Sequence, residues 1–431
     1  MPRSAILPLI TGLLALLLLS GHAQAFDIEA ATQAYLADQS DEDIARINSY
    51  VNTGYLTMVL DAIVAVLVAW LILSRGWSSR WRDMAEKRFN SRFAQAIIYV
   101  PIYVLVTTAL VFPLTWFSDF HTEHKYGLAT QAFPGWFTEF LIGTVVSLVL
   151  LSLFIALLYS VIRRTQERWW AWGALLGTMF LLLVIVISPV YLQPLFNEYR
   201  PMDEGPLKER ILSIARANGM NASDVKQVDE SKQTKRVSAN VSGALGTMRI
   251  ALNDNLLNQA SEEGVEAVMA HEIGHFVLNH MWKRLILFLP LMVVMFLLAH
   301  TIFMAIKRRR GDAWGIRGID DLAGLPLLLA IIAVLELAST PIIFRSVYVA
   351  EVEADLFAIN ATQNPDAWAE VALMTAQYRK LQPPEWEENW LNHHPSPYKR
   401  IQMAMRWKAE NLPEDEETVP KVDEVTEASE E

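Results

Sequence analysis

The sequence predicts a predominantly α-helical protein that crosses a membrane several times. Of its 431 residues, 53% are hydrophobic and only 19% are charged, which excludes an ordinary soluble protein. The apolar residues gather in runs of about twenty, the length of a helix that spans the hydrocarbon core of a bilayer. Two large polar regions, residues 194–283 and 346–431, separate or follow these runs and are expected to fold outside the membrane.

Residues 1–25 allow two interpretations. Arg3 precedes an apolar run, and the small-residue triplet Ala23-Gln24-Ala25 follows it. We therefore expect either a signal peptide that is cleaved after Ala25 or an uncleaved first span. Six further runs are long enough to cross a bilayer. They cover residues 55–74, 94–117, 137–162, 170–193, 284–305 and 322–345, so that the spans occupy regions 55–193 and 284–345.

Lys and Arg gather in three of the segments between the runs. These segments are residues 75–93, 163–168 and 307–317. The positive-inside rule assigns all three to the cytoplasm. The acidic segment 26–54 and both polar regions then lie on the other side, which in a bacterium is the periplasmic side of the inner membrane.

Net charge and cysteine content limit the partners and the kinds of functional site that the chain can have. The formal net charge is −11, and much of it comes from the acidic tail at residues 413–431, which is predicted to be disordered. Since no basic excess suggests nucleic acid, we expect none as a partner. The chain contains no cysteine, which excludes disulfides, thiolate metal sites and cysteine nucleophiles. Any metal must therefore be bound by His, Asp or Glu.

The two polar regions differ in pattern. The first contains a helical stretch at residues 207–218 and strand-like segments at 225–228 and 249–252, which together indicate a small α+β unit. The second, up to residue 412, is mostly helical, with candidate helices at 367–380 and 397–408.

The strongest motif is His271-Glu272-Ile273-Gly274-His275, within an apolar-periodic helix that we expect to begin near Ser261. Positions i and i+4 share one face of a helix, so His271 and His275 can bind one zinc ion. Glu272 can then reach the water in the open fourth position. A helix with two histidines that have structural roles is the alternative.

A catalytic zinc ion needs a third protein ligand, and without cysteine two His and one Glu are the natural set. Glu351 and Asp355, just past the last run, lie four residues apart on one helical face. Glu351 can bind the metal while Asp355 accepts the other ring N–H of a ligand histidine. Glu353 is the competing candidate, and a solvated acidic helix end is the structural alternative.

A third cluster runs from His393 to Arg400 and contains His394, Pro395 and Pro397. Peptide hydrolysis develops negative charge on the carbonyl oxygen, and a His or Arg donor beside the zinc can stabilise it. The alternative is a proline-rich turn that caps a helix.

These motifs resemble the membrane zinc endopeptidases of the type I CAAX prenyl protease family, with bacterial heat-shock membrane metalloproteases as more distant relatives. The resemblance extends over about residues 90–410. It includes Glu123-His124-Lys125-Tyr126-Gly127, Pro194-Leu195-Phe196-Asn197 and Arg249-Ile250-Ala251-Leu252, the continuation of the zinc motif to His280, the E-x-x-A-D element from Glu351 to Asp355, and the H-P-x-x-x-x-R element from His394 to Arg400.

The resemblance implies a chamber of seven membrane helices, counting the first run, with a zincin-type α+β catalytic domain built from the two polar regions. It implies one Zn²⁺ per chain bound by His271, His275 and Glu351, with Glu272 as general base. His280 and Asp355 would support the ligands. It also implies that Asn240, in an edge strand, holds the substrate backbone, and that His394 and Arg400 contact the substrate or the oxyanion.

The sequence therefore predicts a membrane zinc endopeptidase whose partners are polypeptide substrates and the lipid bilayer; it carries no indication of oligomeric state. The predicted orientation favours exported or damaged membrane proteins as substrates over prenylated CAAX proteins, whose C-termini are cytosolic. A catalytically silent chamber or chaperone-like scaffold is the alternative, although such a protein has no need of Glu272.

Polar and aromatic residues in and near the spans are expected to have structural roles. Trp169, Trp170 and Trp172 fall at one end of a run, where an aromatic belt is expected. A transporter would need more charged residues within the spans. Those present, chiefly Asp61, His300 and Glu336, are expected to face the interior of the bundle or the water of the chamber.

Overall fold

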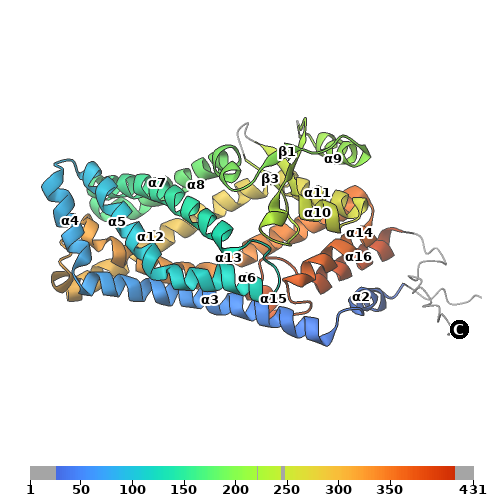
Figure 1. Ribbon diagram of the computed structural model, residues 1–431, viewed down its shortest axis with the longest axis horizontal. Coiled ribbons are helices and arrows are strands. Elements are labelled where there is room, and N and C mark those ends of the chain that lie inside the picture. The colour runs from blue at the N-terminus through green and yellow to red at the C-terminus, as the bar shows by residue number, and fades with distance from the viewer. Residues whose placement is uncertain (1–25, 221, 244–247, 413–431) are drawn as a thin grey trace, which may run out of the picture.

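The computed structural model describes residues 26–220, 222–243 and 248–412. Long helices form an elongated bundle, and a small sheet with several shorter helices lies at one end of it (Figure 1). The predominantly helical fold is as predicted. The signal peptide or first span expected at residues 1–25 and the disordered tail expected at 413–431 lie outside the described residues.

Within the described chain, five helical segments are long and apolar enough to cross a membrane. They are Asp41–Ser74, Arg92–Lys125, Phe133–Leu195, His280–Trp314 and Leu322–Thr362. The six predicted runs all fall within them, because the third segment has 63 residues and contains two runs. The chain turns back within that segment, so that the segment crosses the bundle twice.

The first part of the bundle consists of α3 (Asp41–Ser74), α4 (Trp77–Arg88) and α5 (Arg92–Thr115), which continues through a π-helical turn into α6 (Glu123–Lys125). Ser40 caps α3 by accepting from the amide of Asp43, and three acidic residues in its first turn favour the start of the helix. Gly76, with φ of 63°, makes the tight turn into α4.

The second part contains the hairpin of α7 (Phe133–Thr165) and α8 (Trp169–Ile187), which packs against α12 (His280–Trp314). The chain reverses at Gln166, where φ is 49°, and the Phe154 and Phe180 rings then meet with centroids 4.9 Å apart. Trp169 was expected at the lipid interface. It is instead fully buried in the bundle core, where its Nε1 donates to His300 Nδ1 at 3.0 Å, because a buried indole N–H requires an acceptor. The aromatic-belt prediction is wrong for this residue.

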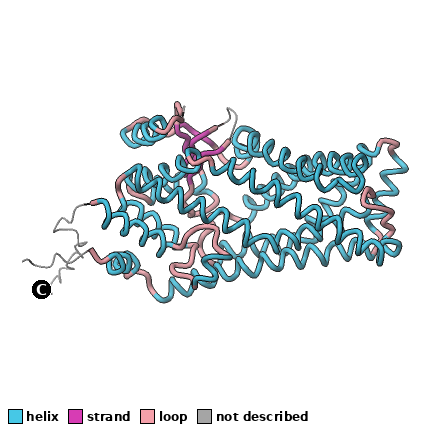
Figure 2. Tube along the Cα trace, turned by 180° about the vertical axis from the view of Figure 1, so that it is seen from behind, coloured by secondary structure: helices cyan, strands magenta, loops and turns pink. Residues whose placement is uncertain are grey.

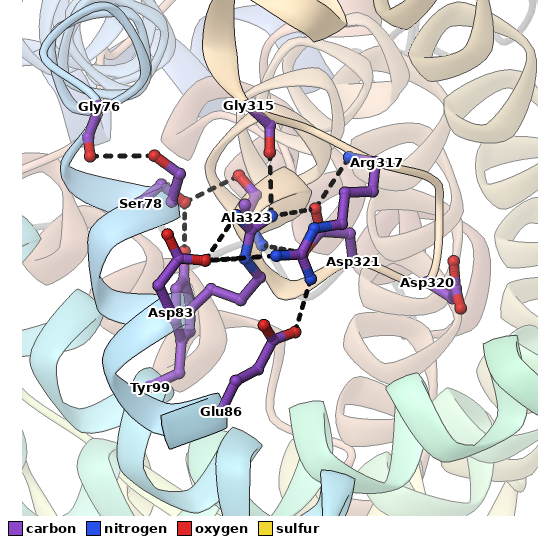
Figure 3. A network of polar contacts seen from close by, with 12 residues as sticks. Gly76, Ser78, Asp83, Glu86, Tyr99, Gly315, Arg317, Asp320, Asp321 and Ala323 are labelled. Carbon is purple, nitrogen blue, oxygen red and sulfur yellow. Dashed lines mark hydrogen bonds and ion pairs between the residues drawn. The ribbon is translucent and has the colours of Figure 1, made fainter. Parts of the chain in front are cut away.

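A polar network ties α4 to the connection between α12 and α13 (Leu325–Thr362) (Figure 3). Its centre is the buried ion pair between Arg82 Nη1 and Asp321 Oδ2, 2.6 Å apart. Ser78 adds a bond to the Ala323 carbonyl at 2.7 Å, and Arg317 Nη1 donates to Glu86 Oε1 at 2.7 Å. The network fixes this end of the bundle.

Removing one member of the central pair should destabilise the protein. In Arg82→Ala, the Asp321 carboxylate would remain buried without its partner, which costs about 3–5 kcal/mol. We expect a clearly lower Tm in detergent for Arg82→Ala than for Lys87→Ala, which removes an exposed cation from the same helix. Equal Tm values for the two variants would contradict a stabilising role for the pair.

Beyond the bundle, four strands form one sheet in the order β1-β2-β4-β3. They are β1 (Tyr199–Pro201), β2 (Val225–Val228), β3 (Ala239–Ser242) and β4 (Arg249–Asn253). The pair β2 and β4 is parallel, whereas β1 and β3 are antiparallel edge strands. The strands predicted at 225–228 and 249–252 are confirmed, and β1 was not expected because it is only three residues long.

The remaining helices surround α11 (Glu262–Val277). They are α9 (Pro206–Ala217), α10 (Asp254–Gln259), α14 (Pro365–Met374), α15 (Glu385–Trp390) and α16 (Pro397–Asn411). Apolar residues on one side of α11, such as Met269, pack with the sheet and α9. Those on the other side, such as Ala270, pack with α14 and α16. The two polar regions of the sequence therefore share α11 as their common core.

The segment after residue 25 also joins this part of the molecule. Helix α2 (Ile28–Leu36) packs on α14 and α16. Tyr398 donates to Glu29 Oε2 at 2.7 Å, and Tyr35 donates to Asp366 Oδ1 at 2.8 Å. The acidic segment 26–54 thus consists of α2, which packs against the C-terminal helices, a short connection and the first turns of α3.

Candidate active site

Helix α11 positions the histidine motif. Ser261 caps it by accepting from the Gly264 amide at 3.1 Å, as its place before the apolar pattern predicts. One turn separates His271 from His275, and their Nε2 atoms lie 3.1 Å apart on one face. The His271 ring also stacks on Trp368, with centroids 5.3 Å apart.

Helix α13 brings Glu351 to the same point. Its Oε2 lies 3.3 Å from His271 Nε2, and its Oε1 lies 3.3 Å from His275 Nε2. These three residues form a group whose ligand atoms lie within 4.8 Å of one another, close enough to hold one metal ion. Glu353 points elsewhere and accepts from Lys283 Nζ at 2.9 Å.

The close approach of α11 and α13 depends on Gly274. A Cβ at this position would lie 2.9 Å from the Phe357 ring of α13, so a larger residue would separate the two helices. Gly274 belongs to the histidine motif, yet its packing role could not be inferred without knowing which helix faces it.

Each histidine of the group is oriented by a second contact. His271 Nδ1 lies 2.9 Å from Asp355 Oδ1, and Asp355 is fully buried. His275 Nδ1 lies 2.8 Å from His280 Nδ1, and His280 Nε2 lies 3.0 Å from Glu353 Oε2.

These contacts determine which ring nitrogens carry protons. Since the carboxylate of Glu353 only accepts, His280 donates through Nε2 and accepts at Nδ1 from His275. Asp355 likewise favours the proton on Nδ1 of His271. In the neutral rings, both arrangements leave the Nε2 lone pairs of His271 and His275 to face Glu351, as metal ligation requires.

The segment between α15 and α16 supplies the third predicted cluster. His394 Nε2 lies 3.2 Å from Glu351 Oε2. The buried Arg400 guanidinium spans two carboxylates: Nη2 donates to Glu351 Oε2 at 3.2 Å, and Nε lies 3.0 Å from Asp355 Oδ2. Arg400 therefore holds the acidic residues of α13 in place.

A cavity of about 1670 Å³ opens over this group. Glu272, His394 and the three grouped residues line its floor, while its apolar wall includes Val184 and Ile185 of α8 and Phe288 of α12. The cavity therefore reaches from the grouped residues to helices that are candidates for crossing the membrane.

Asn240 lies beside this cavity on the edge strand β3, opposite Ala251 of β4. Its neighbours Val241 and Ser242 line the cavity. The Asn240 Oδ1 is buried and has no hydrogen-bond partner among the described residues. An edge strand next to the cavity offers unpaired backbone groups to an extended peptide.

Burial and charge shape the ionisation of the site. Burial disfavours the charged form of His271, but the contacts with Asp355 and Glu351 outweigh it and raise its pKa to about 9. Burial raises the pKa of Glu272, against the opposing effect of the two histidines. Burial together with the Arg379 charge holds the pKa of His394 well below its usual range.

The sequence did not identify Arg379. It lines a second cavity of about 460 Å³, which shares His394 with the first. Other cations there are paired, Arg236 with Glu123 at 2.8 Å and Lys380 with Glu387 at 2.7 Å. The buried Nη1 of Arg379 has no hydrogen-bond partner in the described chain. Burial and the Arg400 charge lower its pKa to about 10.

Comparisons with known proteins agree with these features. A sequence model of peptidase family M48 matches residues 201–408, and one of the CAAX prenyl protease N-terminal region, five membrane helices, matches residues 31–198. A Bacillus subtilis protein described as the uncharacterized metalloprotease YhfN is 28% identical over 399 residues, which cover 92% of this chain and 93% of that protein.

Eukaryotic relatives match a shorter stretch. The CAAX prenyl protease 1 homolog of Dictyostelium discoideum is 30% identical over 208 residues, which cover 48% of this chain and 49% of that protein. CAAX prenyl protease 1 of Saccharomyces cerevisiae is 28% identical over 199 residues, which cover 46% of this chain and 44% of that protein. The chain thus spans about half the length of these relatives.

The crystal structure of S. mikatae Ste24p has a similar fold, with a TM-score of 0.70 and 21% sequence identity over 85% of this chain and 89% of that one. The two adjoining matches together identify the family: residues 201–408 contain the histidine motif, and residues 31–198 contain helical spans. The chain belongs to peptidase family M48 and is a membrane metalloprotease of that family.

Proposed function

We propose that this protein holds one Zn²⁺ ion through His271, His275 and Glu351 and hydrolyses peptide bonds of polypeptides that enter the cavity. The observation that supports this most strongly is the closeness of the ligand groups: the two Nε2 atoms lie 3.1 Å apart, and each lies 3.3 Å from one oxygen of the Glu351 carboxylate. Ligands at zinc distances in a tetrahedral site are separated by about 3.3 Å. The donor set of two imidazoles and one carboxylate also suits zinc.

A zinc ion at this position would supply Lewis acidity, which polarises a scissile carbonyl and makes water a stronger nucleophile. Glu272 would take a proton from that water and pass it to the leaving amine, because its carboxylate lies on the cavity floor beside the ligands. A raised pKa suits a group that must both accept and return a proton.

The other predicted residues would serve the substrate or the ligands. His394 lines the cavity beside Glu351 and would donate to the carbonyl oxygen as it gains negative charge. Arg400 contacts Glu351 and Asp355, which favours a positioning role over the substrate contact that the sequence predicts. Asn240 would bind the substrate backbone as it adds to β3.

The distribution of charge supports an orientation. The three basic segments, 75–93, 163–168 and 307–317, connect helices at the end of the bundle far from α11 (Figure 1). By the positive-inside rule that end would face the cytoplasm. In a bacterial inner membrane the active site would then face the periplasm. Exported and membrane polypeptides would be its substrates, rather than the CAAX proteins for which the eukaryotic relatives are named.

Metal content tests the proposal. We expect elemental analysis of the detergent-purified protein to find one zinc per chain, and to find little in His271→Ala or Glu351→Ala. Glu353→Ala is the matched control, since Glu353 lies two residues away and contacts His280 and Lys283 instead of the grouped atoms.

Among these variants, the rate of cleavage of an unfolded reporter should follow the zinc content. A chelator should abolish cleavage by the wild-type protein, and added zinc should restore it. If Glu351→Ala retained zinc and Glu353→Ala lost it, the third ligand would be Glu353 instead of Glu351. A wild-type protein with neither zinc nor cleavage would support the scaffold alternative.

A further inference from the structure

Helix α4 occupies the end of the bundle opposite the active site (Figures 1 and 2). It connects α3, whose apolar stretch ends at Ser74, with α5, which begins at Arg92. Both neighbours are long and apolar enough to cross a membrane. A short polar helix between two such helices lies at the level of the lipid headgroups.

Both acidic residues of α4 are ion-paired within the protein. Asp83 lies 2.8 Å from Arg82 Nη2, and Glu86 accepts from Arg317 at 2.7 Å, as Figure 3 shows for its labelled members. By contrast, Arg80, Lys87 and Arg88 have no carboxylate partner in the part of the chain that the structure describes. One face of α4 therefore presents three uncompensated positive charges.

These three cations line a hollow of about 720 Å³ together with Met84, Phe89 and Ile98. The remaining lining residue, Asp83, is the one held by Arg82. Met84 is 46% exposed, which is costly in water but favourable against an acyl chain. The hollow thus combines a cationic rim with an apolar surface.

Two of the three cationic groups, those of Arg80 and Arg88, are also held in place before any ligand binds. Arg80 Nη2 donates to the Arg75 carbonyl at 2.7 Å, and the Arg88 guanidinium lies 5.6 Å from the centroid of the Phe89 ring. The buried pair of Arg82 and Asp321 fixes the helix itself. Preorganised donors lose less entropy on binding an anion.

We propose that this hollow binds an anionic phospholipid of the surrounding leaflet, with its phosphate against Arg80, Lys87 and Arg88 and an acyl chain along Met84, Phe89 and Ile98. Guanidinium and ammonium groups bind phosphate through charge-assisted hydrogen bonds. A zwitterionic lipid offers the same phosphate but cancels its charge, so it should bind much more weakly.

Native mass spectrometry of the full-length protein in non-ionic detergent tests this proposal with dioleoyl phosphatidylglycerol as the probe. In the combined variant Arg80→Gln, Lys87→Gln, Arg88→Gln, we expect roughly a hundredfold weaker binding, since each cation near a membrane surface contributes about fivefold. Lys87→Glu alone, which is less disruptive, should weaken binding at least about tenfold. Peptide cleavage in detergent should be unchanged in both.

The matched control is Arg308→Gln, Arg309→Gln, Arg310→Gln, which removes three exposed charges from the end of α12, outside the hollow. It should retain phosphatidylglycerol. Equal loss of lipid in both combined variants would overturn the proposal, because it would show only a general effect of charge. Equal binding of phosphatidylcholine, or of inorganic phosphate at the same concentration, would overturn it as well.

Discussion

Replacing Glu272 by Gln should reduce peptide hydrolysis by about a hundred- to ten-thousandfold, the usual contribution of a general base, while zinc remains bound. The amide has nearly the same shape as the carboxylate but cannot accept a proton from water. Glu272 is not one of the three grouped residues, so the metal site should be unaffected.

The assay should measure cleavage of an unfolded reporter together with zinc content. Glu263→Gln is the matched control, because it makes the same change at an exposed position on the same helix. If Glu272→Gln and Glu263→Gln both cleave the reporter at the wild-type rate, Glu272 is not the general base.

Replacing Arg400 by Ala should affect both stability and metal binding. Glu351 and Asp355 are 5% and 0% exposed, and the Arg400 guanidinium is placed between them. Without it, two buried carboxylates would repel each other, at a cost of about 3–5 kcal/mol in the free energy of unfolding of the metal-free protein. Zinc affinity should fall about 10- to 100-fold, as when other residues that orient metal ligands are lost.

The matched control for this change is Arg406→Ala, an exposed arginine on the same helix. Arg400→Lys should recover part of the stability but not the full effect, because an ammonium group cannot bond both carboxylates in one planar arrangement. Tm and zinc content in Arg400→Ala equal to those of the control would refute the positioning role.

The parts of the site that depend on local sequence could be predicted. The spacing of His271 and His275 on one helix and the cap at Ser261 follow from helical geometry alone. The membrane helices followed from their apolar runs, although the signal peptide or first span expected at residues 1–25 lies outside the described chain.

Features that depend on tertiary contacts could not be predicted in this way. The spacing of Glu351 and Asp355 favoured Glu351 over Glu353, but only the packing of α13 against α11 places Glu351 at the grouped histidines and Glu353 at His280. Trp169 has the sequence context of a lipid-interface residue, yet its partner is His300, 131 positions away. Arg379 belongs to no sequence motif. Only the structure reveals that its Nη1 is buried beside a cavity without a hydrogen-bond partner among the described residues.

The order of the site residues along the chain has a consequence for biosynthesis. His271, Glu272 and His275 are translated before α12, whereas Glu351 lies in the second half of α13, the last candidate span, and Arg400 lies later still. Proteins are made from the N-terminus, so the proposed ligand set would not be complete until much of the final membrane helix has been synthesised. A chain that stalls or is truncated before residue 351 would therefore be inert. The order of synthesis would protect the cell's membrane proteins from cleavage by a half-made protease.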